Sequence, residues 1–240
     1  MPTTELTILD EAYVLAQALK DGGVDARIMG GAGVALHCPP LPNGQQMHRE
    51  IGDIDFFLGS RRETRDMGTV LGAHGYHPDA QFNALNGRER LIFHSDHWKI
   101  DVFIHDFTMC HVIPLANRVS IDWPTLSVTD LLLTKLQVAE FTDKDRSDVI
   151  RLLSSHPLAH EDGDVVNAGH LCAVIAKDWG LWRTLTYNLS AVADAEPALA
   201  PKVEALLKWF DQQPKSTAFR LRAMLGERVR WYEVPEESLR

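Results

Sequence analysis

Cysteine is scarce in this chain: Cys38, Cys110 and Cys172 are the three present among 240 residues, and they lie far apart. An odd number of widely spaced cysteines argues against a disulfide framework and predicts a reducing compartment. The chain also lacks an apolar run close to the roughly 20 residues that a membrane-spanning helix needs. Its first residues show neither the basic nor the apolar region of a secretory signal. We therefore expect a cytoplasmic protein with no membrane partner.

Positive charge is in the minority, since 24 Lys and Arg face 33 Asp and Glu and give a formal net charge of −9. This balance argues against a protein that coats nucleic acid, but it does not exclude an enzyme that contacts RNA locally. Residues 215–230 gather five Lys and Arg against one Glu. We interpret this segment as a solvated helix face, with a groove for a phosphate-rich partner as the alternative.

The apolar pattern predicts a sheet in the first half of the chain and helices in the second. Strand-like runs are expected at 26–29, 53–57, 88–93 and 98–104, and Asn86-Gly87 is typical of a hairpin turn. Prolines predict a loop at 39–44. Helices are expected at 8–21, 32–38, 60–75, 131–141, 142–155, 168–178, 181–193, 200–212 and 217–226. The expected fold class is α/β (α+β), with a mixed-sheet domain at 1–125 and a helical domain at 126–240.

Three aspartates lie in two of the expected strands. Asp53 and Asp55 are separated by one residue, so their side chains share one face of a strand. Asp101 lies in the later strand and supplies a third carboxylate. Converging carboxylates can hold hard divalent cations for phosphoryl transfer. A lone Asp-x-Asp is weak evidence, however, because aspartates at strand ends also cap turns.

Gly30 and Gly31 strengthen this interpretation, because they stand between an expected strand and an expected helix. Glycines at such a position let the backbone approach a phosphate closely, and the helix N-terminus offers unpaired N–H groups to an anion. A glycine pair, a paired aspartate and a later aspartate form an ordered set that chance produces less easily than any single motif.

In that order the set resembles the nucleotidyltransferase superfamily of DNA polymerase β type. The stretch from Gly30-Gly31-Ala-Gly-Val-Ala-Leu-His37 to Asp53-Ile-Asp55-Phe-Phe57 is similar to the form found in the abortive-infection (AbiEii-like) toxin nucleotidyltransferases. The segments 130–137 and 144–148 are similar to that family's Lys-Leu helix and its Lys-Asp-x-x-Asp helix. Together the matches cover about residues 28–152.

The resemblance implies that Asp53, Asp55 and Asp101 are catalytic and bind metal. Asp53 and Asp55 would hold two Mg²⁺ (or Mn²⁺) ions, and Asp101 would bind the second ion and stand close enough to the acceptor hydroxyl to take its proton. Gly30 and Gly31 would contact the phosphates of an NTP, the donor substrate.

Lys135 is a candidate partner for the triphosphate charge, and a surface helix lysine is the alternative. Asp145 and Asp148 would orient Lys135 or pack against the sheet domain. The expected function is metal-dependent transfer of a nucleoside monophosphate to a hydroxyl of RNA, a protein or a small molecule. The resemblance further suggests a toxin of a toxin–antitoxin or phage-defence system, with an antitoxin protein as partner. The alternative is a catalytically silent nucleotidyltransferase fold that binds nucleotide and regulates.

Overall fold

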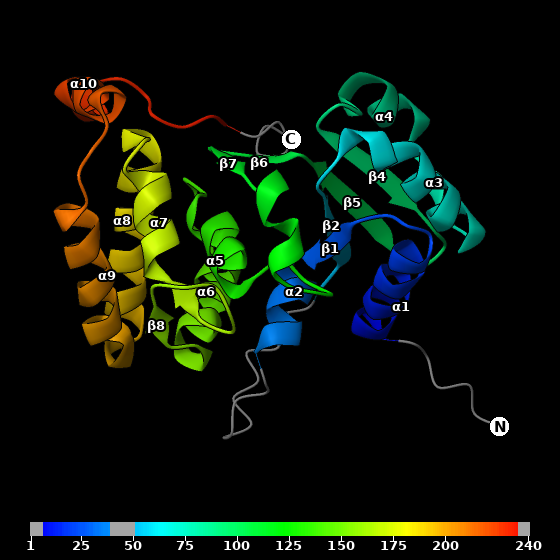
Figure 1. Ribbon diagram of the computed structural model, residues 1–240, viewed down its shortest axis with the longest axis horizontal. Coiled ribbons are helices and arrows are strands. Elements are labelled where there is room, and N and C mark those ends of the chain that lie inside the picture. Colours follow the sequence, from blue (N-terminus) through cyan, green and yellow to red (C-terminus); the bar gives the residue numbers. More distant parts are fainter. Residues whose placement is uncertain (1–6, 39–50, 235–240) are drawn as a thin grey trace. The chain divides into compact units, whose positions relative to one another are not determined.

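The computed structural model describes residues 7–38 and 51–234, and the chain forms two compact units (Figure 1). The first unit contains residues 1–107 and 114–127, and the second contains 108–113 and 128–240. The expected division into two domains at residues 125/126 stays a prediction. The loop expected at 39–44 lies outside the described residues.

The first unit is built on a five-stranded sheet with the strand order β1-β2-β5-β4-β3. Strands β2 and β5 are parallel, whereas the other neighbouring pairs are antiparallel. The α/β fold class with a mixed sheet is therefore confirmed. The strands are β1 (Ala26–Met29), β2 (Asp53–Leu58), β3 (His77–Pro78), β4 (Arg90–His94) and β5 (Lys99–Ile104).

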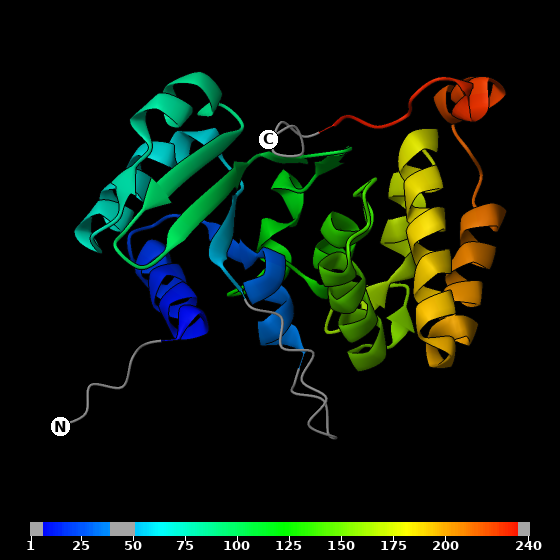
Figure 2. The ribbon, with the colours of Figure 1, turned by 180° about the vertical axis from the view of Figure 1, so that it is seen from behind.

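One face of this sheet forms the core of the first unit together with α1 (Ile8–Asp21) and α3 (Thr64–Ala73) (Figure 2). Because side chains alternate along a strand, every second residue of β2 and β5 enters this core and the others lie on the opposite face. The residues of β2 and β5 that enter this core are Ile54, Phe56, Leu58, Ile100, Val102 and Ile104. The aspartates therefore lie on the face away from the core.

The hairpin expected at Asn86-Gly87 is wrong, because residues 80–86 form the helix α4 (Ala80–Asn86). The Asp79 side chain caps the start of this helix by accepting the backbone N–H of Phe82, and Gly87 ends it. The Asn83 side chain contacts both backbone polar groups of Ile92 on β4. Side-chain hydrogen bonds thus fix a helix where the Asn-Gly pair alone favoured a turn.

Short elements complete the first unit. Helix α2 (Gly30–His37) follows β1 directly, and the 3₁₀ turn η1 (Arg61–Glu63) precedes α3. The side chain of Ser60 accepts the N–H of Arg62 at this turn, in keeping with the helix start expected there. A second 3₁₀ segment, η2, spans Ala116–Ile121.

The second unit is mainly helical. It contains α5 (Val128–Leu136), α6 (Asp143–Ser155), α7 (Ala168–Ile175), α8 (Trp179–Ala195), α9 (Ala200–Gln212) and α10 (Thr217–Leu225), with 3₁₀ turns η3 (Pro197–Leu199) and η4 (Gly226–Arg228). The strands β8 (Leu158–Ala159) and β9 (Val166–Asn167) pair within this unit. A further short pair, β6 (Asp106–Thr108) with β7 (Val112–Pro114), has residues assigned to each of the two units. Helix α5 ends earlier than the expected 141, because the Asn188 side chain donates to the carbonyls of Leu136 and Val138.

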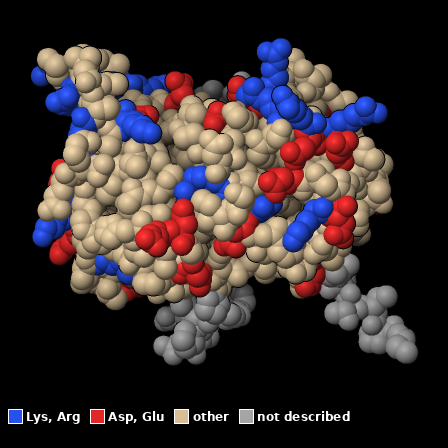
Figure 3. Space-filling model, in the orientation of Figure 1, with Lys and Arg blue, Asp and Glu red and all other residues tan. Residues whose placement is uncertain are grey.

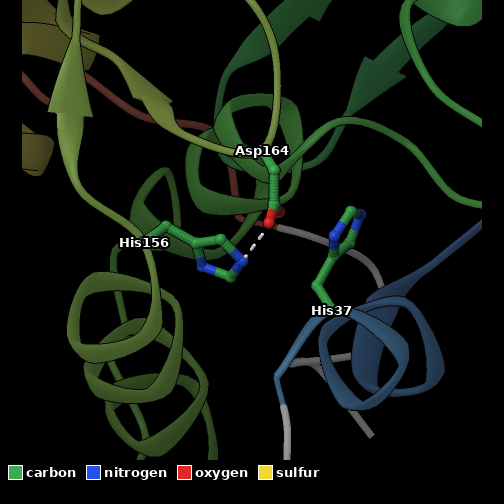
Figure 4. Close-up of side chains that lie close together, drawn as sticks. All are labelled: His37, His156 and Asp164. Carbon is green, nitrogen blue, oxygen red and sulfur yellow. Dashed lines mark ion pairs between the residues drawn. The ribbon is translucent and has the colours of Figure 1, made fainter.

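The C-terminal end of α6 is held by polar contacts within the second unit. His156 lies 2.9 Å through Nδ1 from the carbonyl of Leu152, and its Nε2 lies 3.1 Å from Oδ1 of Asp164 (Figure 4). Lys202 of α9 donates to the carbonyls of His156 and Leu153. These contacts satisfy carbonyl groups that a helix end leaves without partners.

The three cysteines are free and buried, as expected for a chain without disulfides. Charged side chains of both signs are interspersed on the face drawn in Figure 3. Among residues 7–38 and 51–234, no helix combines the length and the apolar character needed to cross a bilayer.

Candidate active site

The structure brings the three sequence-predicted carboxylates together in the first unit. Asp53 and Asp55 lie on β2, and the parallel pairing of β2 with β5 sets Asp55 beside Asp101. Each aspartate offers one oxygen, and these atoms all lie within 4.8 Å of one another. Hard carboxylate oxygens at this spacing fit a divalent cation such as Mg²⁺ or Mn²⁺.

The three aspartates differ in their exposure to solvent. The Asp101 side chain is 2% exposed, that of Asp53 is 46% exposed, and Asp55 is half-buried. The cluster therefore runs from a buried carboxylate on β5 to an accessible one on β2. A ligand from solvent meets Asp53 and Asp55 before it meets Asp101.

Two cations of the same unit engage Asp101. Arg90 of β4 donates through Nε to Oδ1 of Asp101 at 3.1 Å, and its Nη2 lies 3.0 Å from the same oxygen. The Nζ of Lys99 lies 2.6 Å from Oδ2 of Asp101 and 3.8 Å from Oδ2 of Asp53. Burial alone lowers the pKa of Lys99, but the hydrogen bond and charge of Asp101, with the charge of Asp53, outweigh burial and raise it. Lys99 is thus held as an ammonium ion within the cluster.

Gly30 shapes the part of the site next to Asp55. It begins α2 with a φ of 62°, a left-handed conformation that favours glycine. A Cβ at this position would lie 1.9 Å from Oδ2 of Asp55, so only a glycine lets the helix start against this carboxylate. The N-cap residue Met29 makes no side-chain cap, and the partial positive charge of the helix start favours a negative group there. Gly31 is the second, buried residue of α2.

Lys135 belongs to the second unit, where it lies on α5. Its Nζ is 2.9 Å from Oδ2 of the fully buried Asp148 and 3.7 Å from Oδ1 of Asp145. Two carboxylates of α6 thus orient this largely buried ammonium group, so Lys135 is not an ordinary surface lysine. The contacts expected of Lys135, Gly30 and Gly31 with phosphate stay predictions.

Lys99 and Arg90 were not among the site residues expected from the sequence. A signal for Lys99 was present, because it stands two residues before Asp101 on one strand and so shares its face. A signal for Arg90 was weaker. The four-residue turn 95–98 pairs His94 with Lys99, which places Arg90 on the same face as Asp101. Both cations could have been found by extending the alternation rule to the positive residues.

No protein-family model matches the chain, and no curated protein matches its sequence. Among solved structures, the chain is similar to an antigenic nucleotidyltransferase-like protein from Paracoccidioides brasiliensis. The similarity has a TM-score of 0.47 and 15% sequence identity, and it covers 88% of this chain and 95% of the other. A likeness at this TM-score carries no argument about the activity of this chain.

Proposed function

We propose that this chain is a metal-dependent nucleotidyltransferase. The observation that carries the proposal is the convergence of Asp53, Asp55 and Asp101 on one sheet face, beside a helix that begins at Gly30. The order of these residues along the chain, which resembles the nucleotidyltransferase superfamily of DNA polymerase β type, supports the same function.

In the proposed reaction, an acceptor hydroxyl oxygen forms a bond to the α-phosphorus of an NTP. The bond from that phosphorus to the bridging oxygen of the β-phosphate breaks, and pyrophosphate leaves. The hydroxyl proton passes to water or to a carboxylate of the cluster. Asp53 and Asp55 would hold the divalent ion, which neutralises phosphate charge and polarises the reacting oxygens when bound. Backbone N–H groups at the start of α2 would orient phosphate.

The test is transfer of label from each of the four α-³²P-labelled NTPs to material in a cell extract with Mg²⁺. We expect label to enter an acceptor, and Asp55→Asn to reduce the rate by at least about a hundredfold because a ligand to the divalent ion is lost. Asp96→Asn is the matched control, since Asp96 is an exposed aspartate of the turn between β4 and β5. If Asp55→Asn and Asp96→Asn transfer label equally well, the assignment is wrong.

A catalytically silent, nucleotide-binding protein is the second candidate. It is favoured by one observation, that Arg90 and Lys99 already engage both oxygens of Asp101. Calorimetric binding of an NTP with Mg²⁺, without any labelled acceptor or released pyrophosphate, would support this candidate over the enzyme.

The acceptor and the biological role are further proposals that rest on the sequence resemblance. A toxin would arrest growth when it is expressed without its antitoxin, and Asp55→Asn would relieve the arrest if nucleotidyl transfer causes it. Growth curves of cells that express the two forms at equal protein levels test this role.

A further inference from the structure

The ammonium group of Lys99 lies within the carboxylate cluster. In the parallel pair of β2 and β5, Lys99 is the direct neighbour of Asp53, and Asp101 is the direct neighbour of Asp55. The Lys99 side chain extends along β5, so that its ammonium group contacts Asp101 and approaches Asp53. The ammonium group of Lys99 therefore lies between the carboxylates of Asp53 and Asp101.

We infer that Lys99 is the resident cation of Asp101, so that this chain binds one divalent ion, at Asp53 and Asp55, in place of two. The inference rests on the proposed function, because it concerns the number of ions at the same site. Lys99 is a positioning residue in this account, because it holds Asp101 while the divalent ion binds at Asp53 and Asp55.

The contacts of Asp101 carry the argument. Arg90 engages Oδ1 through Nε and Nη2, and Lys99 engages Oδ2. A metal ion bound to Asp101 would compete with these two cations for a carboxylate that is 2% exposed. The incoming ion would also lie next to two partly buried positive charges and would weaken their contacts with Asp101, which is unfavourable on both counts.

Formal charge supports the same count of ions. The three carboxylates, the ammonium of Lys99 and the guanidinium of Arg90 have a summed formal charge of −1. One divalent ion reverses that charge, and a second ion would add positive charge where Arg90 and Lys99 already stand. Like charges confined to a partly desolvated site disfavour the second ion.

The experiment counts Mn²⁺ ions bound to the full chain, without nucleotide, by electron paramagnetic resonance of the free ion up to millimolar Mn²⁺. We expect one bound ion for the wild type and two for Lys99→Met, which frees Oδ2 of Asp101. Lys99→Arg keeps the positive charge and should still bind one. The double variant Lys99→Met/Asp101→Asn should return to one, because the new ligand is gone. Lys20→Met, a distant lysine of α1 that lies over the ring of Trp123, is the matched control and should bind one.

Two results would overturn the inference while leaving the proposed function intact: two ions bound to the wild type, or a single ion bound to Lys99→Met. A different result, no bound ion in the wild type or in any variant, would overturn the metal-dependent function itself. Circular dichroism of each variant checks that it is folded. If Lys99→Met is unfolded, Lys99→Arg still tests the inference. Two ions bound to the wild type and to Lys99→Arg would then refute the inference.

Discussion

Gly30→Ala tests whether the start of α2 is shaped by the carboxylate of Asp55. The substitution places a side chain on a residue with φ of 62°, which costs roughly 1–2 kcal/mol for an L-residue. The new Cβ would also lie 1.9 Å from Oδ2 and 2.7 Å from Cγ of Asp55, so the carboxylate or the backbone must move. Overpacking of this kind costs about 1–3 kcal/mol. The expected loss in free energy of unfolding is therefore roughly 2–5 kcal/mol.

Gly23→Ala is the matched control for this prediction. Gly23 has a similar φ of 76°, but a Cβ there would meet no atom within 4 Å. It should lose only the backbone cost, roughly 1–2 kcal/mol. Urea denaturation followed by circular dichroism measures both variants, and an unchanged slope shows that the midpoint reports stability.

A further variant separates the two contributions at Gly30. In an Asp55→Ala background, the cost of Gly30→Ala should fall toward that of Gly23→Ala, because the clashing carboxylate is absent. Gly30→Ala should also weaken Mn²⁺ binding, whereas Gly23→Ala should not. Equal losses for Gly30→Ala and Gly23→Ala, with equal Mn²⁺ affinity, would refute the contact between Gly30 and Asp55.

Three other predictions concern ligands and pH. An NTP with Mg²⁺ at about a hundred times its dissociation constant should stabilise the fold by about 2.7 kcal/mol and raise the melting temperature. This rise should vanish in Asp55→Asn. A rise that persists in Asp55→Asn would show that the nucleotide binds at another site. Burial and the hydrogen bond from its hydroxyl to Glu11 raise the pKa of Tyr76 above its usual 10. The folded chain then keeps a proton that the unfolded chain loses, so the free energy of unfolding should fall as pH rises above 10. Urea midpoints measured across this pH range should fall less steeply in Tyr76→Phe. Burial lowers the pKa of His111 below its usual 6.5, with Asp178 opposing the shift. The folded chain then resists taking up a proton, so stability should fall as pH drops through this region; an equally steep acid loss in His111→Gln would contradict this.

Local signals in the sequence account for much of the fold. The helix expected at 8–21 is α1 with the same bounds. Its apolar periodicity and the glycine at its end are local signals that can be recognised from the sequence alone. Thr142 caps the start of α6 as expected, with its side chain accepting the N–H of Asp145. The shared face of Asp53 and Asp55 also follows from alternation alone. Each of these features depends on contacts only a few residues apart.

Features that depend on distant contacts were less accessible. The parallel register that sets Asp55 beside Asp101 pairs strands that are far apart in the chain, and no local pattern specifies it. Helix α4 was missed because Asn86-Gly87 is a stronger local signal than the Asp79 cap, and the decisive contacts of Asn83 are made with β4. The ion pairs of Lys135 also join two helices of the second unit, and the family resemblance offered them as one of two alternatives.

The parallel pairing of β2 with β5 also bears on how the chain folds. Parallel strands need a long crossover, and contacts between distant segments are the slow part of folding because loop closure must come first. Asp53 and Asp55 are close in the sequence and so are near each other in the unfolded chain. Asp101 comes close to them only when this crossover has formed. The paired strands β4 and β5 bring Arg90 and Lys99 together with Asp101, so they add two positive charges and one negative charge to the two carboxylates of β2. The pairing of β2 with β5 would therefore reduce the repulsion between Asp53 and Asp55. The charges of β2 in this way favour its pairing with β5.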